Sequence, residues 1–223
     1  MEELNSVGYV IITDFITMTP TQFDFLTRAL TNHSPFLFNI EGAEIFNQTH
    51  RGLNDGLRRM TSLDLWLTAT GTEADSPGLI HRLQLAVQRI IAALPAEYRH
   101  EVQPAEIYII RSDAGCLQQA AHTDYETDHA DFGNINTAPL SFFFAISPGA
   151  KLVLWERPNT SSQLQARTIE LEQGQAFLLL GSKVHSGAAY DKENFRGFMY
   201  LHQHTYVPPI PRLTDPPHAA SRR

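Results

Sequence analysis

The sequence predicts a mainly β protein, a double-stranded β-helix or jelly roll in which an antiparallel double sheet is buttressed by N-terminal helices. Short β-rich runs separated by Gly, Pro, Asp or Asn fill the second half of the chain, a pattern typical of a sandwich or barrel. After Ile107 no connection is long enough for parallel crossovers, which favours antiparallel pairing. Two amphipathic helical patterns precede these runs.

The first expected helix begins after Thr19. This residue fits an N-cap, Pro20 fits the first helical position, and Gln22 completes a capping box three residues after the cap. Apolar residues then recur at helical spacing, namely Phe23, Leu26 and Leu30.

The second expected helix begins with Ser76 as its cap and Pro77 as its first residue, and Pro95 ends it. Its apolar residues form a stripe wide enough to pack against a sheet. The stripe comprises Leu79, Ile80, Leu83, Val87, Ile90, Ile91 and Leu94.

The expected strands are short segments bounded by turn-forming residues. They are 8–15, 107–110, 117–122, 140–146, 152–155, 167–171, 176–180 and 195–202. With 223 residues the chain fits one domain, which we expect to span 1–207 with a helical N-terminal part. We expect residues 208–223, which contain five prolines, to form an irregular tail.

The composition argues against several classes of protein. A formal net charge of −7 predicts no strong general binding to nucleic acids. Arg51, Arg58 and Arg59 could form a local basic patch, although a solvated surface is the more ordinary interpretation. The single cysteine, Cys116, excludes an intramolecular disulfide.

The N-terminus is acidic, and the longest apolar runs, 142–146 and 176–180, are far shorter than the roughly 20 residues that span a bilayer. We therefore expect a soluble, cytoplasmic protein without a signal or membrane segment.

His122 and Asp124 carry the strongest chemical signal. They lie two residues apart at the end of an expected strand, so their side chains can share one face and bind one ion. His185, arriving from another strand, would complete two histidines and one carboxylate. That set covers one face of an octahedral iron and leaves three positions open, enough for a 2-oxo acid and dioxygen.

Arg196 follows His185 by eleven residues within an otherwise apolar run. A buried arginine is costly unless it is paired. A dicarboxylate co-substrate would supply a partner that matches the fork of the guanidinium. A structural ion pair with Asp191 or Glu193 is the alternative.

This ordered set, His-x-Asp, a distal histidine and then an arginine, resembles the iron(II) and 2-oxoglutarate-dependent dioxygenase superfamily. The similarity covers about Ala105 to His202, and the stretch Gly181 to Leu201 is particularly similar to the phytanoyl- and prolyl-hydroxylase-like branches. The resemblance implies that His122, Asp124 and His185 bind iron(II) and that Arg196 grips the far carboxylate of 2-oxoglutarate.

The resemblance also implies the reaction class. Hydroxylation or oxidative demethylation would consume dioxygen and 2-oxoglutarate and release succinate and carbon dioxide, with ascorbate as a reductant. Halogenating relatives lack the carboxylate ligand, whereas Asp124 is present. The family often adds a polar side chain from an inner strand, and Tyr108 or Gln118 are the candidates for this contact with the co-substrate.

Several alternatives stay open. A second His-x-Asp, His129 and Asp131, lies in a polar stretch that we interpret as a loop, and His202 or His204 could face the pocket. A zinc hydrolase or a non-catalytic binding module could use the same fold. The primary substrate could be a peptide, a nucleobase or a small metabolite, and residues between about 36 and 66 are expected to help cover the mouth of the site.

Overall fold

The computed structural model describes residues 4, 7–16, 18–32, 57–63, 79–94, 102–104, 107–125, 139–156 and 164–203. Its helices are α2 (Pro20–Asn32) and α5 (Leu79–Ala93). Its strands are β1 (Tyr9–Ile12), β2 (Arg58–Ser62), β3 (Val102–Pro104), β4 (Tyr108–Ser112), β5 (Leu140–Ala145), β6 (Ala150–Glu156), β7 (Gln165–Leu171), β8 (Ala176–Leu180), β9 (His185–Gly187) and β10 (Asn194–Gln203).

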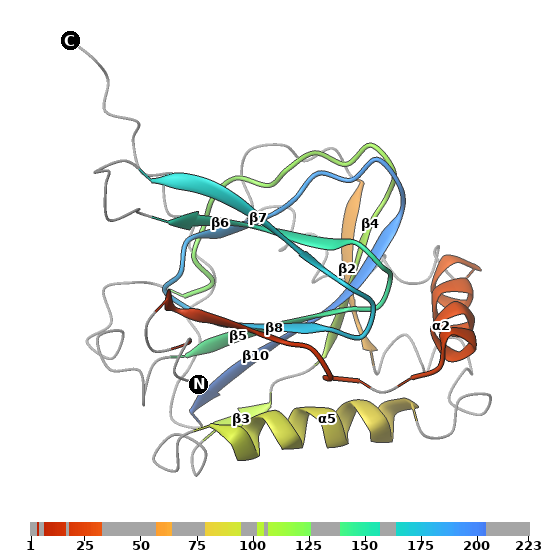
Figure 1. Cartoon of the computed structure of the whole chain (residues 1–223). Helices are drawn as coiled ribbons and strands as arrows, with labels where there is room; N and C mark the ends of the chain where they lie inside the picture. Colours follow the sequence, from red (N-terminus) through yellow and green to blue (C-terminus); the bar gives the residue numbers. More distant parts are fainter. Residues whose placement is uncertain are drawn as a thin grey trace.

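The strands form two antiparallel sheets that face each other (Figure 1). The larger sheet has the order β1-β8-β5-β10-β4-β2, and β3 pairs with the end of β10. The smaller sheet has the order β7-β6-β9. This arrangement confirms the predicted jelly roll, and α5 crosses the outer face of the larger sheet as a buttress (Figure 1).

Alternation along β5 divides the interior into two cores. Phe142 and Phe144 point out of the double sheet, where they pack with the apolar residues of α2 and α5. Phe143 and Ala145 point between the sheets, where they pack with residues of β6, β8 and β10. A strand that is apolar on both faces therefore reflects two packed layers rather than one.

The capping box of α2 is present as predicted. The Thr19 backbone N–H donates to Gln22 Oε1 at 2.9 Å, and the Gln22 N–H donates to Thr19 Oγ1 at 3.3 Å. Phe23, Leu26 and Leu30 are buried against the outer core. Ser76, Pro77 and Pro95, expected to delimit the second helix, lie outside the described residues.

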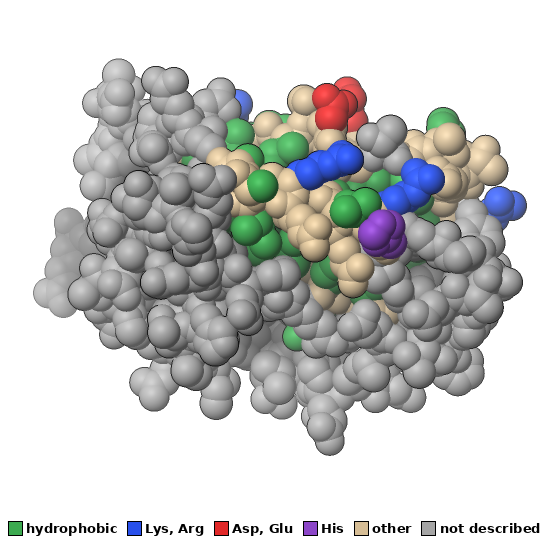
Figure 2. Space-filling model, turned by 90° about the horizontal axis from the view of Figure 1, so that it is seen from below, with side chains coloured by type: hydrophobic (Ala, Val, Ile, Leu, Met, Phe, Trp, Pro, Cys, Tyr) green, Lys and Arg blue, Asp and Glu red, His purple; other side chains and the backbone are tan. Residues whose placement is uncertain are grey.

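Seen from the side of α5, the described surface mixes single basic and acidic groups with apolar and polar ones (Figure 2). Neither described helix is long and apolar enough to cross a lipid bilayer.

One predicted strand is wrong. The segment 117–122 forms no regular strand and touches its neighbour through isolated bridges, Cys116 to Tyr190 and His122 to His185. The sequence patterns also missed β2, β3 and β9, of which β3 and β9 have only three residues each. The expected tail, 208–223, lies outside the described residues.

Candidate active site

His122 and His185 are brought together by an isolated antiparallel bridge. The N–H of His122 donates to the carbonyl oxygen of His185 at 2.9 Å, and the reciprocal bond measures 2.8 Å. Residues directly opposite each other in such a pair project to the same side. Their ring centroids accordingly lie 4.6 Å apart, although 62 residues separate them in the chain.

Backbone carbonyls define the tautomer of both rings. His122 Nδ1 lies 2.8 Å from the oxygen of Ala120, and His185 Nδ1 lies 3.0 Å from the oxygen of Lys183. A carbonyl oxygen only accepts hydrogen bonds, so each Nδ1 carries a proton, and a ring in its neutral form presents the lone pair of Nε2. This is the usual outer-shell arrangement of metal-binding histidines.

Asp124 completes the cluster. Its Oδ1 lies 3.9 Å from His122 Nε2 and its Oδ2 lies 3.5 Å from His185 Nε2. One potential ligand atom from each residue falls within 4.8 Å of the others. Asp124 Oδ2 is buried without a hydrogen-bond donor, so a cation between the three side chains would satisfy a group that is otherwise costly to bury.

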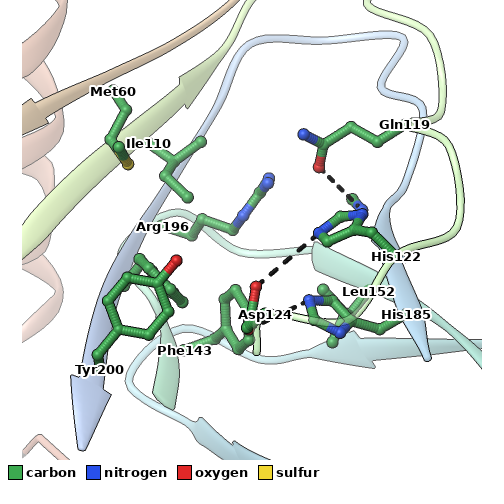
Figure 3. Close-up of a pocket in the computed structure, with 12 residues that line it drawn as sticks. Met60, Ile110, Gln119, His122, Asp124, Phe143, Leu152, His185, Arg196 and Tyr200 are labelled. Atoms are coloured by element: carbon green, nitrogen blue, oxygen red, sulfur yellow. Dashed lines mark hydrogen bonds and ion pairs between the residues drawn. The ribbon is translucent and has the colours of Figure 1, made fainter. Parts of the chain in front are cut away.

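The three side chains open onto a pocket with about 390 Å³ of empty space, part of it open to solvent (Figure 3). Apolar side chains form most of its wall, and Arg196 enters from β10. The lining residues are Met60, Ile110, Gln119, His122, Asp124, Phe143, Leu152, His185, Gly187, Arg196, Phe198 and Tyr200.

Arg196 is only 3% exposed, and its guanidinium points into this pocket. Nη1 donates to Ser112 Oγ at 3.3 Å and to Tyr190 Oη at 3.5 Å, while Nε is buried without a partner. Glu193, one suggested ion-pair partner, binds Arg111 instead. Among the described residues no carboxylate forms an ion pair with Arg196, which leaves its charge for a ligand.

Gln119 rather than Gln118 lines the pocket. Gln118 is exposed and donates to Ser186 Oγ, whereas Gln119 accepts from the Gly187 N–H at 3.0 Å. Between the bridges at Cys116 and His122 this segment has five residues, whereas the opposite segment has only four between His185 and Tyr190. One extra residue, as in a β-bulge, inverts strand alternation, so the expectation that Gln118 shares the face of His122 is wrong.

Tyr108 lies in β4 and packs at the edge of the core between the sheets, but it is not a lining residue of the pocket. Tyr200 of β10 lines the pocket instead. Burial, followed by the charge of Asp124 and by Tyr108, raises the pKa of Tyr200 well above its ordinary value. Its spacing of four from Arg196 along one strand was a signal that could have revealed it.

The other histidine candidates lie beyond what the structure describes. His129, Asp131 and His204 are outside the described residues, and only the backbone of His202 is described, in β10. Of the stretch expected to cover the mouth, the described part is 57–63, and Met60 of β2 does line the pocket.

Comparisons of sequence find no relative. No family model matches the chain, and no curated protein matches it.

Comparisons with solved structures do find matches. A prolyl hydroxylase from Trichoplax adhaerens, solved with a peptide fragment of the hypoxia inducible factor oxygen degradation domain, aligns with a TM-score of 0.59 over 91% of this chain and 86% of its own. The chain has the fold of the 2-oxoglutarate and iron(II) oxygenases. Identity with that prolyl hydroxylase is only 13%, so the shared property is the fold.

Two further oxygenase-fold structures agree. A Pseudomonas putida prolyl-4-hydroxylase gives a TM-score of 0.52 at 13% identity, covering 91% of this chain and 96% of its own. The epimerase SnoN, solved with Fe3+, alpha ketoglutarate and nogalamycin RO, gives 0.51 at 15% identity, covering 96% and 88%. The resemblance inferred from the sequence is thus confirmed at the level of the fold.

Proposed function

We propose that this protein is an iron(II)- and 2-oxoglutarate-dependent dioxygenase. One observation carries the proposal. The ligand atoms of His122, Asp124 and His185 converge within 4.8 Å in a pocket that also contains the buried guanidinium of Arg196. A metal centre and an anion anchor in one cavity match the two ends of a chelating 2-oxo acid.

The donor set fits iron(II). Two imidazole nitrogens and one carboxylate suit a non-haem iron that keeps open positions for other ligands. Thiolate ligands are absent from the described pocket, because Cys116 does not line it. His122, Asp124 and His185 would hold the metal, and Arg196 would hold the distal carboxylate of 2-oxoglutarate.

Iron(II) and 2-oxoglutarate, when bound, would supply the oxidation: dioxygen and 2-oxoglutarate would be consumed, succinate and carbon dioxide released, and one oxygen atom inserted into a C–H bond of the substrate. Hydroxylation follows directly, and oxidative demethylation follows when the hydroxylated carbon is a methyl group on nitrogen or oxygen. Ascorbate would serve as a reductant that keeps the iron ferrous.

The residues of the chain provide geometry and exclude water. The Nδ1 bonds to Ala120 and Lys183 hold both imidazoles in orientation. Phe143 packs edge-on against His185 with 5.7 Å between ring centroids, which shields that ligand from solvent. Tyr200 keeps its phenolic proton near neutral pH, so it can donate a hydrogen bond within the pocket.

The proposal is tested by adding iron(II) and then 2-oxoglutarate to the protein without oxygen. A chelated 2-oxo acid gives a weak visible charge-transfer band, and we expect this band to appear. On admission of oxygen, substrate-stimulated release of succinate is expected from a screen of peptides, nucleobases and small metabolites. Iron binding without the band would contradict the proposal and favour another metal chemistry, such as that of a zinc hydrolase.

A further inference from the structure

A second buried arginine lies beside the co-substrate anchor. Arg58 of β2 is 6% exposed, although the sequence alone offered it as part of a surface basic patch. Its Nε donates to Ser112 Oγ at 3.2 Å, and its Nη2 donates to the Ala188 oxygen at 2.5 Å and approaches Cys116 Sγ at 3.4 Å. Nη1 takes part in none of these bonds.

The two guanidinium groups meet over Gly187. A Cβ at this glycine would come within 2.9 Å of both Arg196 Nη2 and Arg58 Nη1. The Ser112 hydroxyl oxygen also accepts from both arginines. Gly187 and Arg196 line the pocket, and the tip of Arg58 lies against the same glycine, although Arg58 is not itself a lining residue.

Two like charges are therefore buried together without an acid. In the described part of the chain, neither arginine has an ion pair with a carboxylate, and the acids of this region, Asp113 and Glu193, bind Arg111. Burial, reinforced by Arg196, lowers the pKa of Arg58 to about 10, so Arg58 remains cationic at neutral pH. An uncompensated pair of buried cations destabilises a fold unless an anion joins them.

We propose that Arg58 joins Arg196 in a double-guanidinium site that holds the distal carboxylate of the co-substrate and makes that carboxylate a requirement for binding. This inference rests on the proposed function, because the metal centre sets which end of the 2-oxo acid reaches the arginines. A carboxylate between the two groups accepts charge-assisted hydrogen bonds from both. A side chain at Gly187 would collide with both arginine tips and with Gln119 Oε1, which lies closer still to the position of a Cβ.

A purely structural role for Arg58 is the alternative, since its hydrogen bond to the Ala188 oxygen connects β2 to the residues after β9. The two roles differ in what Arg58→Gln would change. If the role of Arg58 is structural, the variant protein should lose thermal stability and should bind all ligands more weakly by the same factor. If Arg58 sets specificity, the variant should lose affinity only for ligands with a distal carboxylate.

The decisive experiment titrates anaerobic iron(II) protein with 2-oxoglutarate and with 2-oxobutyrate, which keeps the chelating end but lacks the distal carboxylate. For Arg58→Gln we expect about a tenfold loss of 2-oxoglutarate affinity, the equivalent of one charged hydrogen bond. The affinity for 2-oxobutyrate should stay unchanged. Equal losses for both acids, or no loss for 2-oxoglutarate, would overturn the proposal.

Two further variants serve as controls for Arg58→Gln. Arg58→Lys keeps the charge but loses the fork of the guanidinium. Its ratio of 2-oxoglutarate affinity to 2-oxobutyrate affinity should therefore fall between the ratios of the parent and of Arg58→Gln. If Arg58→Gln fails to fold, an unchanged ratio in Arg58→Lys overturns the proposal. Arg111→Gln, on the neighbouring strand β4, removes the same charge from an arginine outside the pocket and should keep the parental ratio.

A metal-free measurement separates this inference from the oxygenase proposal. Glutarate, a dicarboxylate without the 2-oxo group, should raise the melting temperature of the parent more than that of Arg58→Gln, because a ligand stabilises the state that binds it. If the parent binds iron but gives no band, the oxygenase proposal fails. Even then, a larger rise in melting temperature for the parent than for Arg58→Gln would support the anion site, and equal rises in both proteins would overturn it.

Discussion

At the scale of single residues, the site depends on side chains whose polar atoms lack partners within the described protein. Asp124 Oδ2 and Arg196 Nε are both buried and unbonded. Buried polar groups are nearly always satisfied, and exceptions concentrate where a ligand or ion belongs. The unsatisfied Asp124 oxygen lies beside two imidazoles and suits a metal ion. The unsatisfied Arg196 nitrogen lies across the pocket and suits the distal end of an anion that chelates this metal.

Asp124→Ala is expected to abolish iron-dependent turnover. Changes to groups outside the ligand set alone reduce metal affinity by about 10- to 100-fold, so loss of a ligand should reduce iron affinity by more than about a hundredfold. Iron affinity and succinate release check this. Asp131→Ala, in the second His-x-Asp, is the matched control and should keep most activity. An inactive Asp131→Ala beside an active Asp124→Ala would show that the ligand assignment is wrong.

Arg196→Gln is expected to weaken 2-oxoglutarate binding while iron binding survives. The change removes the charge and fork of the guanidinium, which corresponds to one or two charged hydrogen bonds or about 3 kcal/mol. That is on the order of a hundredfold in affinity. Titration with 2-oxoglutarate beside a melting curve provides the test. A lower melting temperature with parental affinity would mean that Arg196 has a structural role.

At the scale of elements, local hydrogen bonding and long-range pairing contribute differently. The capping box of α2 satisfies the Thr19 and Gln22 backbone N–H groups within four residues of chain. The segment 116–122, by contrast, takes its conformation from residues 185–190, far along the chain. Only the first kind of element can be identified from its own residues.

Thr19→Ala tests the helix cap. Loss of the hydroxyl acceptor should lower the free energy of unfolding by about 1 kcal/mol. Urea denaturation measures this loss, and 2-oxoglutarate affinity should not change because α2 contributes no residue to the pocket. Thr21→Ala, at an exposed position inside the first turn, should leave stability nearly unchanged. Equal losses in both variants would argue against the cap.

At the scale of the whole molecule, the larger sheet separates a supporting core from a functional one. Its outer face is covered by α2 and α5, whereas its inner face meets the smaller sheet and supplies six of the twelve residues that line the pocket. Arg196 can stay buried because this inner layer holds a cavity beside it.

Phe142→Ala tests this separation. Phe142 has no exposed surface and packs at 4.7 Å between ring centroids against Phe15 in the outer core. Its removal should lower the free energy of unfolding by about 3–5 kcal/mol, as buried aromatic truncations do. Below the melting transition the variant should still bind iron and 2-oxoglutarate. Loss of iron binding by a folded variant would mean that the two cores are not independent.

The sequence by itself determined the features that depend on local order. Alternating and continuous apolar runs located seven strands of the jelly roll, and the cap at Thr19 located α2. His122, Asp124, His185 and Arg196 were selected from spacing and resemblance, and the structure brings all four into one pocket. Whether they bind iron and 2-oxoglutarate stays a prediction.

The tertiary structure alone decided which neighbours complete the site. Gln119 replaces Gln118 because one extra residue inverts the alternation before His122, and no local pattern records that insertion. Arg58 meets Arg196 because β2 and β10 both pair with β4, across 138 positions of chain. Periodicity reports which face of an element is apolar, whereas contacts between distant segments depend on register, which is set only when the sheets assemble.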